Sequence, residues 1–203
     1  LPVEANDFER ALINSCSRLS MTGPIRMWSV LQSLNHIKQN SIDGSCVECG
    51  VWRGGNLALM SKYSENLELK QPIIGFDTFE GMPQADEVDK DFLNNSANEI
   101  MRNSVKDEKI PNIHCYASLE QVKNNLNKLG INNVRLIKGA VEDTLKVIEN
   151  IPKRISLLRL DTDWYESTKV EEGQEALWQT VHLIRHLRNS NWVRMLINSS
   201  QQQ

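Results

Sequence analysis

Two kinds of hydrophobic pattern alternate along the chain. Short apolar runs typical of buried strands lie at residues 45–50, 72–77, 133–139 and 155–161. Apolar residues recur at helical spacing over 24–43 and 56–67, and further helical patterns start at Ser118 and Val141. Strands that alternate with helices predict an α/β fold with a doubly wound, mainly parallel sheet, in which ligands bind beyond the carboxyl ends of the strands.

Local signals mark the ends of some helices and one long connection. Pro24 suits the first turn of a helix, which we expect to end near Gly44 and to cover an edge of the sheet. Ser118 and Gln121 form a capping-box pattern at the start of a later helix. The polar, weakly patterned segment 80–112 predicts a mobile lid or insertion over the ligand cleft.

Composition and charge argue against several classes of protein. A chain of 203 residues with 40% hydrophobic content fits one globular domain. Its net charge of -3 comes without a basic stripe, so we expect neither nucleic acid nor a membrane surface as a partner. The chain has no signal-peptide pattern and no apolar run near the roughly 20 residues that span a bilayer, which predicts a cytoplasmic protein. Cys46 and Cys49 would point to opposite faces of a strand, so they indicate buried thiols rather than a metal or redox site.

Carboxylates stand in or at the end of three predicted strands. These acids are Glu48, Asp77 and Asp161. Since parallel strands end at the same edge of a sheet, we expect the three side chains to converge on one cleft. Asp163 follows Asp161 by two residues, in the string "LLRLDTDWYEST".

A glycine-rich loop follows the first predicted strand. Its spacing, G-x-x-x-G-G from Gly50 to Gly55, differs from the G-x-G-x-x-G of dinucleotide-binding loops. Glu48 lies two residues before the first glycine, and an acid there suits a cationic ligand better than a phosphate. Asp77 is placed to accept hydrogen bonds from ribose hydroxyls. A sulfonium combined with a ribose describes S-adenosylmethionine.

Several longer strings resemble one known family. "VECGVWRGGNLALM", "GFDTFEGMP", "SLEQV", "EDTL" and "LRLDTDWYEST" occur in the order and roughly the spacing of the macrocin O-methyltransferases, which methylate antibiotic sugars. The resemblance covers about residues 20 to 170. It implies a Rossmann-like class I methyltransferase fold, S-adenosylmethionine and Mg²⁺ as cofactors, and a small-molecule hydroxyl acceptor, most simply a sugar. A homo-oligomer is left open.

The resemblance also implies roles for single residues. The cofactor-binding positions are Glu48, Gly50, Trp52, Gly54, Asp77, Ser118, Gly139 and Val141. Asp161 is the implied metal ligand, and either Asp161 or Asp163 is the implied catalytic base that takes the proton from the acceptor hydroxyl. A hard cation with oxygen ligands is consistent with magnesium.

The C-terminal part departs from the family pattern. Where family members carry two adjacent aspartates that complete the metal site, this chain offers Asn198 and Ser199. We therefore divide the single domain, residues 1–203, into a helical cover at 1–44, a cofactor-binding core at 45–170 and a divergent, altered or truncated tail at 171–203. An O-methyltransferase is the leading interpretation. The alternatives are an S-adenosylmethionine-binding protein with weakened catalysis and a nicotinamide-dependent oxidoreductase.

Overall fold

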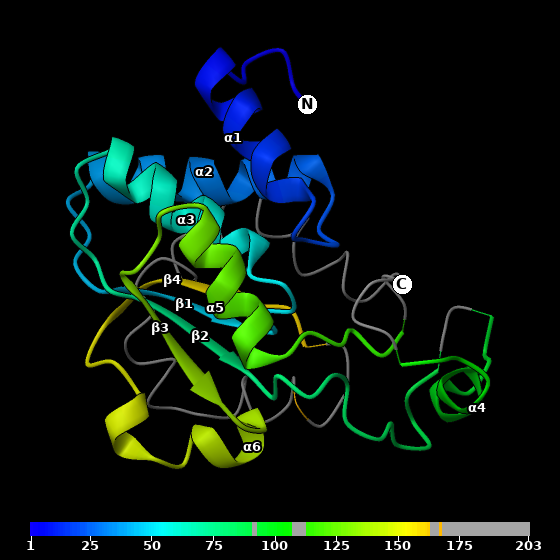
Figure 1. Ribbon diagram of the computed structural model, residues 1–203. Coiled ribbons are helices and arrows are strands. Elements are labelled where there is room, and N and C mark those ends of the chain that lie inside the picture. The colour runs from blue at the N-terminus through cyan, green and yellow to red at the C-terminus, as the bar shows by residue number, and fades with distance from the viewer. Residues whose placement is uncertain (91–92, 107–112, 163–166, 168–203) are drawn as a thin grey trace.

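A four-stranded parallel sheet forms the centre of the protein (Figure 1). The computed structural model describes residues 1–90, 93–106, 113–162 and 167. The strands are β1 (Ser45–Cys49), β2 (Ile73–Asp77), β3 (Val134–Lys138) and β4 (Ile155–Leu160), in the spatial order β3-β2-β1-β4. The predicted strands and the parallel sheet are confirmed. Because the chain leaves β1 toward β2 and later returns to pair β4 on its other side, the order reverses at β1, which is where such sheets bind ligands.

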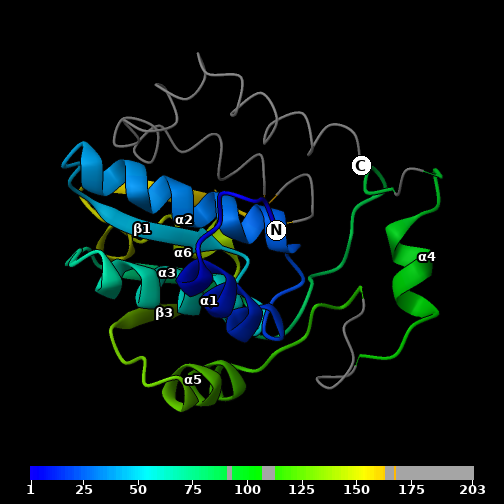
Figure 2. The ribbon, with the colours of Figure 1, turned by 90° about the horizontal axis from the view of Figure 1, so that it is seen from above.

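Helices cover both faces of this sheet. The helices of the described residues are α1 (Asp7–Ser17), α2 (Pro24–Gln39), α3 (Gly55–Asn66), α4 (Ala97–Arg102), α5 (Leu119–Lys128) and α6 (Val141–Thr144), with a 3-10 turn at Ile148–Asn150, and all of them but α4 lie near the sheet. Apolar residues of α1, α2, α3 and α5 form one core with one face of the sheet, and α6 packs on the opposite face (Figures 1 and 2). The sheet is doubly wound, as predicted.

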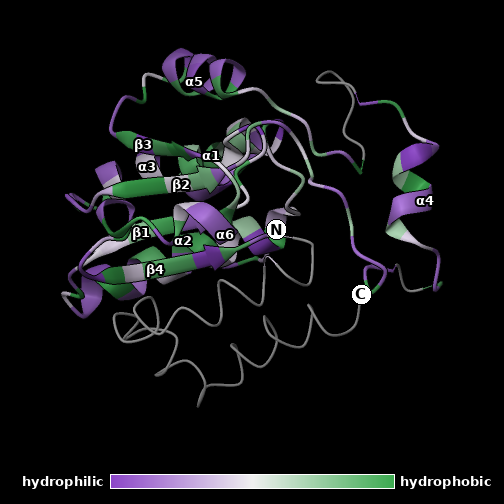
Figure 3. Cartoon of the chain, turned by 90° about the horizontal axis from the view of Figure 1, so that it is seen from below, coloured by the Kyte–Doolittle hydropathy of each residue, from purple (hydrophilic) through white to green (hydrophobic). Residues whose placement is uncertain are grey.

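Strand β1 is buried along its whole length, which explains why its sequence is a short apolar run rather than an alternating one. Its residues still alternate between the two cores. Cys46 belongs to the core beneath α2 and α3, and Cys49 belongs to the core beneath α6. The opposite orientation predicted for the two thiols is therefore confirmed. Figure 3 shows the hydrophobic colour concentrated on the strands.

The ends of the predicted helices agree in part with the structure. Helix α2 begins at Pro24 but ends at Gln39, before the predicted stop near Gly44. Its apolar residues join the core on one face of the sheet, where α2 contacts β4, the strand at one end of the described order. The Ser118 side chain caps α5 by accepting a hydrogen bond from the backbone N–H of Gln121 at 3.2 Å. The helix predicted from Val141 is a single turn.

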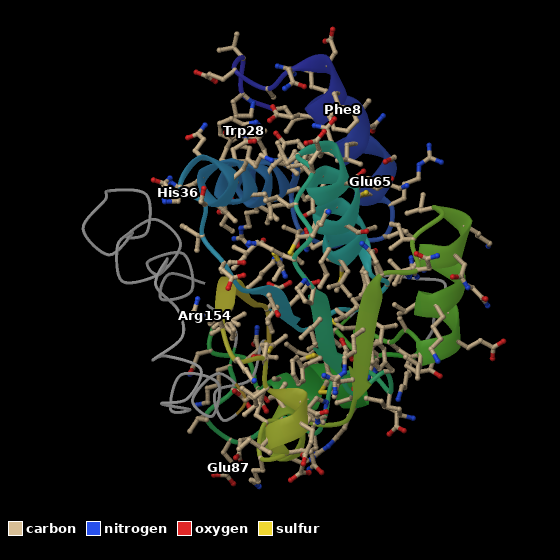
Figure 4. The ribbon with its side chains drawn as sticks, turned by 90° about the vertical axis from the view of Figure 1, so that its left-hand side faces the viewer. Phe8, Trp28, His36, Glu65, Glu87 and Arg154 are labelled. Atoms are coloured by element: carbon tan, nitrogen blue, oxygen red, sulfur yellow. The ribbon has the colours of Figure 1, made fainter. Side chains whose placement is uncertain are left out.

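Helix α1, for which the apolar spacing gave no prediction, is held by a buried carboxylate. Asn6 and Glu9 form a complete capping box at its start. The Glu9 carboxylate also accepts hydrogen bonds from Trp28 Nε1 at 3.2 Å, Gln32 Nε2 at 3.1 Å and Tyr63 Oη at 2.8 Å. One acid thus joins α1 to α2 and α3, and Figure 4 labels Trp28 where α2 approaches α1.

The segment predicted as a lid or insertion leaves the sheet after β2. Its helix α4 stands apart from the strands in both ribbon views (Figures 1 and 2). The start of the segment is anchored, since the N–H of Met82 donates to the carbonyl of His114 at 2.7 Å. Its predicted mobility stays a prediction. Among the described residues, none of the helices has the length and apolar character needed to cross a membrane.

We predict that Glu9→Gln lowers the free energy of unfolding by about 3 kcal/mol, because the amide cannot accept from all the buried donors that face it. Burial alone would raise the pKa of Glu9, but the hydrogen bonds from Tyr63, Asn6, Trp28 and Gln32 together lower it below 4.5. A lowered pKa means that the stabilisation is present above pH 4.5 and is lost as the pH falls through the folded value. Urea denaturation at several pH values measures both effects.

Glu65→Gln is the matched control, because Glu65 is exposed on α3 and pairs only with Lys62 at 3.4 Å among the described residues (Figure 4). We expect that substitution to change the unfolding free energy by under about 1 kcal/mol. Equal costs for Glu9→Gln and Glu65→Gln would show that the buried network contributes nothing beyond an ordinary surface acid.

Candidate active site

A pocket opens at the carboxyl ends of the strands, at the point where the strand order reverses. Its walls come from the loop after β1, the end of β2 and the turn into the lid segment, the start of α6, and the end of β4. The connection between α1 and α2 adds Met21. Apolar side chains supply much of the lining, with carboxylates among them, and this combination suits a ligand with a flat apolar part and a cationic part.

The structure brings most of the predicted cofactor residues to this pocket. Those that line it are Gly50, Trp52, Asp77, Gly139 and Val141. Asp161, predicted as catalytic and metal-binding, also lines it, at the end of β4. Within the described chain, Glu48, Gly54 and Ser118 lie outside the lining. Asp163, Asn198 and Ser199 fall outside the described residues.

The loop after β1 turns sharply at residues with left-handed backbone. Gly50 has φ 85°, and a Cβ atom there would overlap the carbonyl oxygen of Asp161. Glycine therefore allows the loop to touch the end of β4. Gly54 is the N-cap residue of α3, with φ 89°, and a Cβ atom added there would meet the Val122 side chain of α5. Gly54 thus has a packing role, which the spacing of the glycines does not reveal.

The backbone N–H groups of this loop are engaged within the protein. Gly50 donates to the carbonyl of Phe76, Gly54 to that of Val51 and Gly55 to that of Leu19, at 2.9, 3.0 and 2.9 Å respectively. The N–H groups of Val51 and Trp52 donate to the Asp77 carboxylate at 2.7 and 3.0 Å. A dinucleotide loop offers such groups to a pyrophosphate. In this loop the same kind of N–H groups donate to acceptors within the protein.

A buried guanidinium connects Glu48 to the pocket. Glu48 on β1 and Arg159 on β4 are register partners, and Arg159 Nη1 lies 2.7 Å from Glu48 Oε1. Arg159 Nη2 lies 2.9 Å from Asp161 Oδ2 and donates to Thr22 Oγ1 at 2.7 Å. Asp161 and Glu48 thus share one arginine, but only Asp161 reaches the pocket, because Glu48 is 1% exposed.

Burial dominates the electrostatics of Glu48. It raises the pKa of Glu48 to about 7, against the opposing effect of the Arg159 charge, and the nearby Asp161 charge adds to the rise. The same two acids raise the pKa of Arg159 despite its burial, so Arg159 stays charged. Glu48 was predicted to meet a cationic ligand. In the structure the Glu48 carboxylate faces the guanidinium of Arg159 instead.

The basic residue Arg159 was not predicted as part of the site. Its signal in the sequence is a single arginine within the apolar run of β4, two residues before Asp161 and therefore on the same face of the strand. A charge in a strand that is otherwise buried needs a partner. Pairing β1 with β4 would have identified Glu48 as that partner.

The predicted magnesium site can be compared with the described residues only in part. Asp161 is partly exposed at the pocket and carries an ion pair with Arg159. In the portion of the chain with described coordinates, no group of three His, Cys, Asp or Glu side chains gathers to hold a metal ion. The residues present there do not by themselves fit a magnesium centre.

Comparisons with known proteins agree with this architecture. The model of the macrocin-O-methyltransferase family matches residues 9–183. The chain belongs to the macrocin O-methyltransferase family. Among solved structures, it is similar to the O-methyltransferase NovP, with a TM-score of 0.63 and 27% identity over 80% of this chain and 63% of that one. The calicheamicin methyltransferase CalS11 shares the fold, with a TM-score of 0.51 and 20% identity over 88% of this chain and 76% of that one.

Two curated proteins similar to this chain come from Streptomyces. One is the 8-demethyl-8-(2,3-dimethoxy-alpha-L-rhamnosyl)-tetracenomycin-C 4'-O-methyltransferase of Streptomyces olivaceus, 30% identical over 73% of this chain and 54% of its own length. The other is the demethyldecarbamoylnovobiocin O-methyltransferase of Streptomyces niveus, 29% identical over 73% of this chain and 53% of its own length. The chain spans about half the length of these relatives.

We predict that Arg159→Met lowers the free energy of unfolding by about 3 kcal/mol at neutral to alkaline pH, because it leaves the buried Glu48 carboxylate unpaired. The loss should shrink below about pH 7, where Glu48 takes up a proton. Chemical denaturation across this pH range gives the measurement. In the double variant with Glu48→Gln, part of the lost stability should return.

Arg154→Met is the matched control. Arg154 lies just before β4 (Figure 4) and pairs with Asp43 at 3.3 Å, but both side chains are exposed to solvent. Removing that pair should cost under about 1 kcal/mol at any pH in the range. If the two arginine variants lose the same stability, the buried ion pair is not what holds β1 to β4.

Proposed function

We propose that this protein is an S-adenosylmethionine-dependent O-methyltransferase that acts on a hydroxyl of a sugar or another small molecule. The observation that carries the proposal is the position of Asp161. In a chain of this family, it is a partly exposed carboxylate at the end of β4, on the wall of the pocket and in contact with the loop after β1. The proposed base, Asp161, therefore lies beside the proposed cofactor site.

The pocket supports the cofactor chemically. Trp52 and Val141 offer apolar surfaces for the adenine ring, and Asp77 and Asp161 bring negative charge near a sulfonium. Gly139 adopts φ 142°, which lets the chain turn from β3 into α6 beside the ligand. In this proposal the cofactor-binding residues implied by the family are kept, with Glu48, Gly54 and Ser118 acting from behind the wall.

The proposed reaction is one displacement. The acceptor hydroxyl oxygen attacks the methyl carbon of the sulfonium in line, the carbon–sulfur bond breaks, and S-adenosylhomocysteine leaves as a neutral thioether. The hydroxyl proton goes to the Asp161 carboxylate, which acts as general base. Asp163, the other candidate base, lies outside the described residues. Arg159 holds Asp161 Oδ2 from the protein side.

Magnesium assistance is part of the proposal through the family resemblance alone. Asp161 is its proposed ligand, and no step of the reaction above passes through the metal. The relatives' names give the acceptor class: a rhamnosyl-tetracenomycin for one and a demethyldecarbamoylnovobiocin for the other. We extend to this chain only a hydroxyl-bearing small molecule, with a sugar as the first choice.

Two other functions would give different measurements. A nicotinamide-dependent oxidoreductase needs loop N–H groups for a pyrophosphate, and the engagement of those of Gly50, Val51, Trp52, Gly54 and Gly55 speaks against it. An S-adenosylmethionine-binding protein without catalysis shares the cofactor site. Calorimetry with S-adenosylhomocysteine and with NAD tests the first alternative. Methyl transfer from labelled S-adenosylmethionine to a panel of sugar acceptors, with and without Mg²⁺, tests the second.

We predict that Asp161→Asn leaves S-adenosylhomocysteine affinity within about twofold but slows methyl transfer by about a hundredfold or more, because the amide cannot take the hydroxyl proton. Calorimetry and initial rates are the two measurements. The control is Asp143→Asn, an exposed acid on α6 that pairs with Lys146 at 3.4 Å and should leave both values unchanged. Turnover at the parent rate in Asp161→Asn would remove this residue from the role of base.

A further inference from the structure

The Thr22 hydroxyl, in the connection between α1 and α2, receives two hydrogen bonds from distant parts of the chain. Arg159 Nη2 on β4 donates to Thr22 Oγ1 at 2.7 Å, and Asn56 Nδ2 on α3 donates to it at 3.0 Å. A hydroxyl oxygen can accept both, and it keeps its own proton for another partner. Thr22 lies outside the pocket lining of the described residues. Its hydroxyl therefore joins the connection, α3 and β4 behind the pocket wall.

Arg159 uses the same nitrogen for Thr22 and for the proposed base. Nη2 carries two hydrogens, and its second partner is Asp161 Oδ2 at 2.9 Å. The other end of the guanidinium is held by the buried Glu48, whose Oε1 lies 2.7 Å from Nη1. A guanidinium is planar and its donors point in fixed directions. The contact with Thr22 therefore helps to determine the direction in which the remaining Nη2 hydrogen points at Asp161.

The connection that carries Thr22 is anchored at two further points. The N–H of Gly55 donates to the carbonyl of Leu19 at 2.9 Å, and the N–H of Thr22 donates to Ser20 Oγ at 3.0 Å. A Cβ atom at Gly55 would overlap the Leu19 carbonyl, so glycine lets the connection lie directly on the start of α3. This contact gives a role to the last glycine of the G-x-x-x-G-G loop. With its backbone held in this way, Thr22 presents its hydroxyl to Arg159 from a defined position.

We infer that Thr22 is a positioning residue, whose hydroxyl aligns Arg159 so that Arg159 orients the Asp161 carboxylate in the pocket. The inference rests on the proposed function for the role of Asp161 as the base. Because the Asp161 side chain is 45% exposed, packing alone does not fix it, and the ion pair at Oδ2 supplies a restraint. Proton transfer during an in-line displacement is sensitive to a misplacement of about 1 Å, so this restraint bears on the rate.

The test compares Thr22→Val, which keeps the shape of the side chain but removes the hydroxyl, with Thr22→Ser, which keeps the hydroxyl. In Thr22→Val we expect methyl transfer from labelled S-adenosylmethionine to slow by about tenfold, with S-adenosylhomocysteine affinity within about twofold of the parent. Thr22→Ser should restore most of the rate. The control is Ser29→Ala, which removes a hydroxyl that donates to the Arg26 carbonyl within α2 at 2.7 Å and should leave the rate unchanged. A parent-like rate in Thr22→Val, or equal losses in Thr22→Val and Thr22→Ser, would overturn the inference.

A double-mutant cycle shows whether Thr22 acts through Asp161. In the Asp161→Asn background, Thr22→Val should slow the residual reaction by less than about twofold, because the base that Thr22 positions is already absent. A loss of about tenfold in both backgrounds would mean that Thr22 acts independently of Asp161, which contradicts the inference. A general loss of stability would not produce this non-additivity, and a urea midpoint measured for each variant separates the two effects.

Crystal structures keep the inference testable if no acceptor reacts. In Thr22→Val, or in Thr22→Ala if the valine variant does not fold, the distance from Arg159 Nη2 to Asp161 Oδ2 should grow beyond about 3.5 Å. An unchanged pair of Arg159 and Asp161 overturns the inference whether or not the chain is active. If the parent chain neither binds S-adenosylhomocysteine nor transfers a methyl group, the proposed function fails, and the structural comparison still decides the role of Thr22.

Discussion

The pairing of Glu48 with Arg159 is the constraint on which the site depends. Both side chains lie inside a sheet whose other members are almost wholly apolar, and neither charge would be tolerated there alone. Strands β1 and β4 are far apart in the sequence and become neighbours only in the folded sheet. The Glu48–Arg159 pair therefore also holds the end of β4, with Asp161, beside the glycine loop that follows β1. Glu48, which the sequence assigns to ligand binding, is therefore part of the assembly of the sheet.

Glu48, Asp77 and Asp161 show which properties of the site a sequence pattern can predict. Their common placement at one edge of the sheet follows from strand periodicity and parallel topology, and the strands themselves were predicted. The different environments of the three acids could not be predicted from periodicity and topology. Glu48 faces Arg159, Asp77 faces backbone N–H groups, and Asp161 faces the pocket. Which partner each acid has depends on contacts between residues far apart in the chain, and a periodicity carries no information about them.

Features that depend on neighbouring residues could be predicted from the sequence. Features that depend on tertiary contacts could not. The cap of α5 at Ser118 follows from the residues themselves. Helix α1 carries a capping signal at Asn6 and Glu9, but its amphipathic pattern is interrupted because a charged residue, Glu9, faces inward. The backbone of Trp52 could not be predicted, since a left-handed aromatic residue runs against its own preference and exists only through the tertiary contacts with Asp77.

Met21 occupies a different kind of position in the pocket wall. Its neighbours are fixed: the Ser20 hydroxyl accepts from the N–H of Thr22 at 3.0 Å, and the Thr22 hydroxyl accepts from Arg159 and from Asn56 Nδ2. The side chain between them is unbranched and adaptable. A substitution of Met21 would therefore reshape the cavity while the ion pairs beneath it stay intact, so the shape of the pocket and the assembly of the sheet depend on different residues.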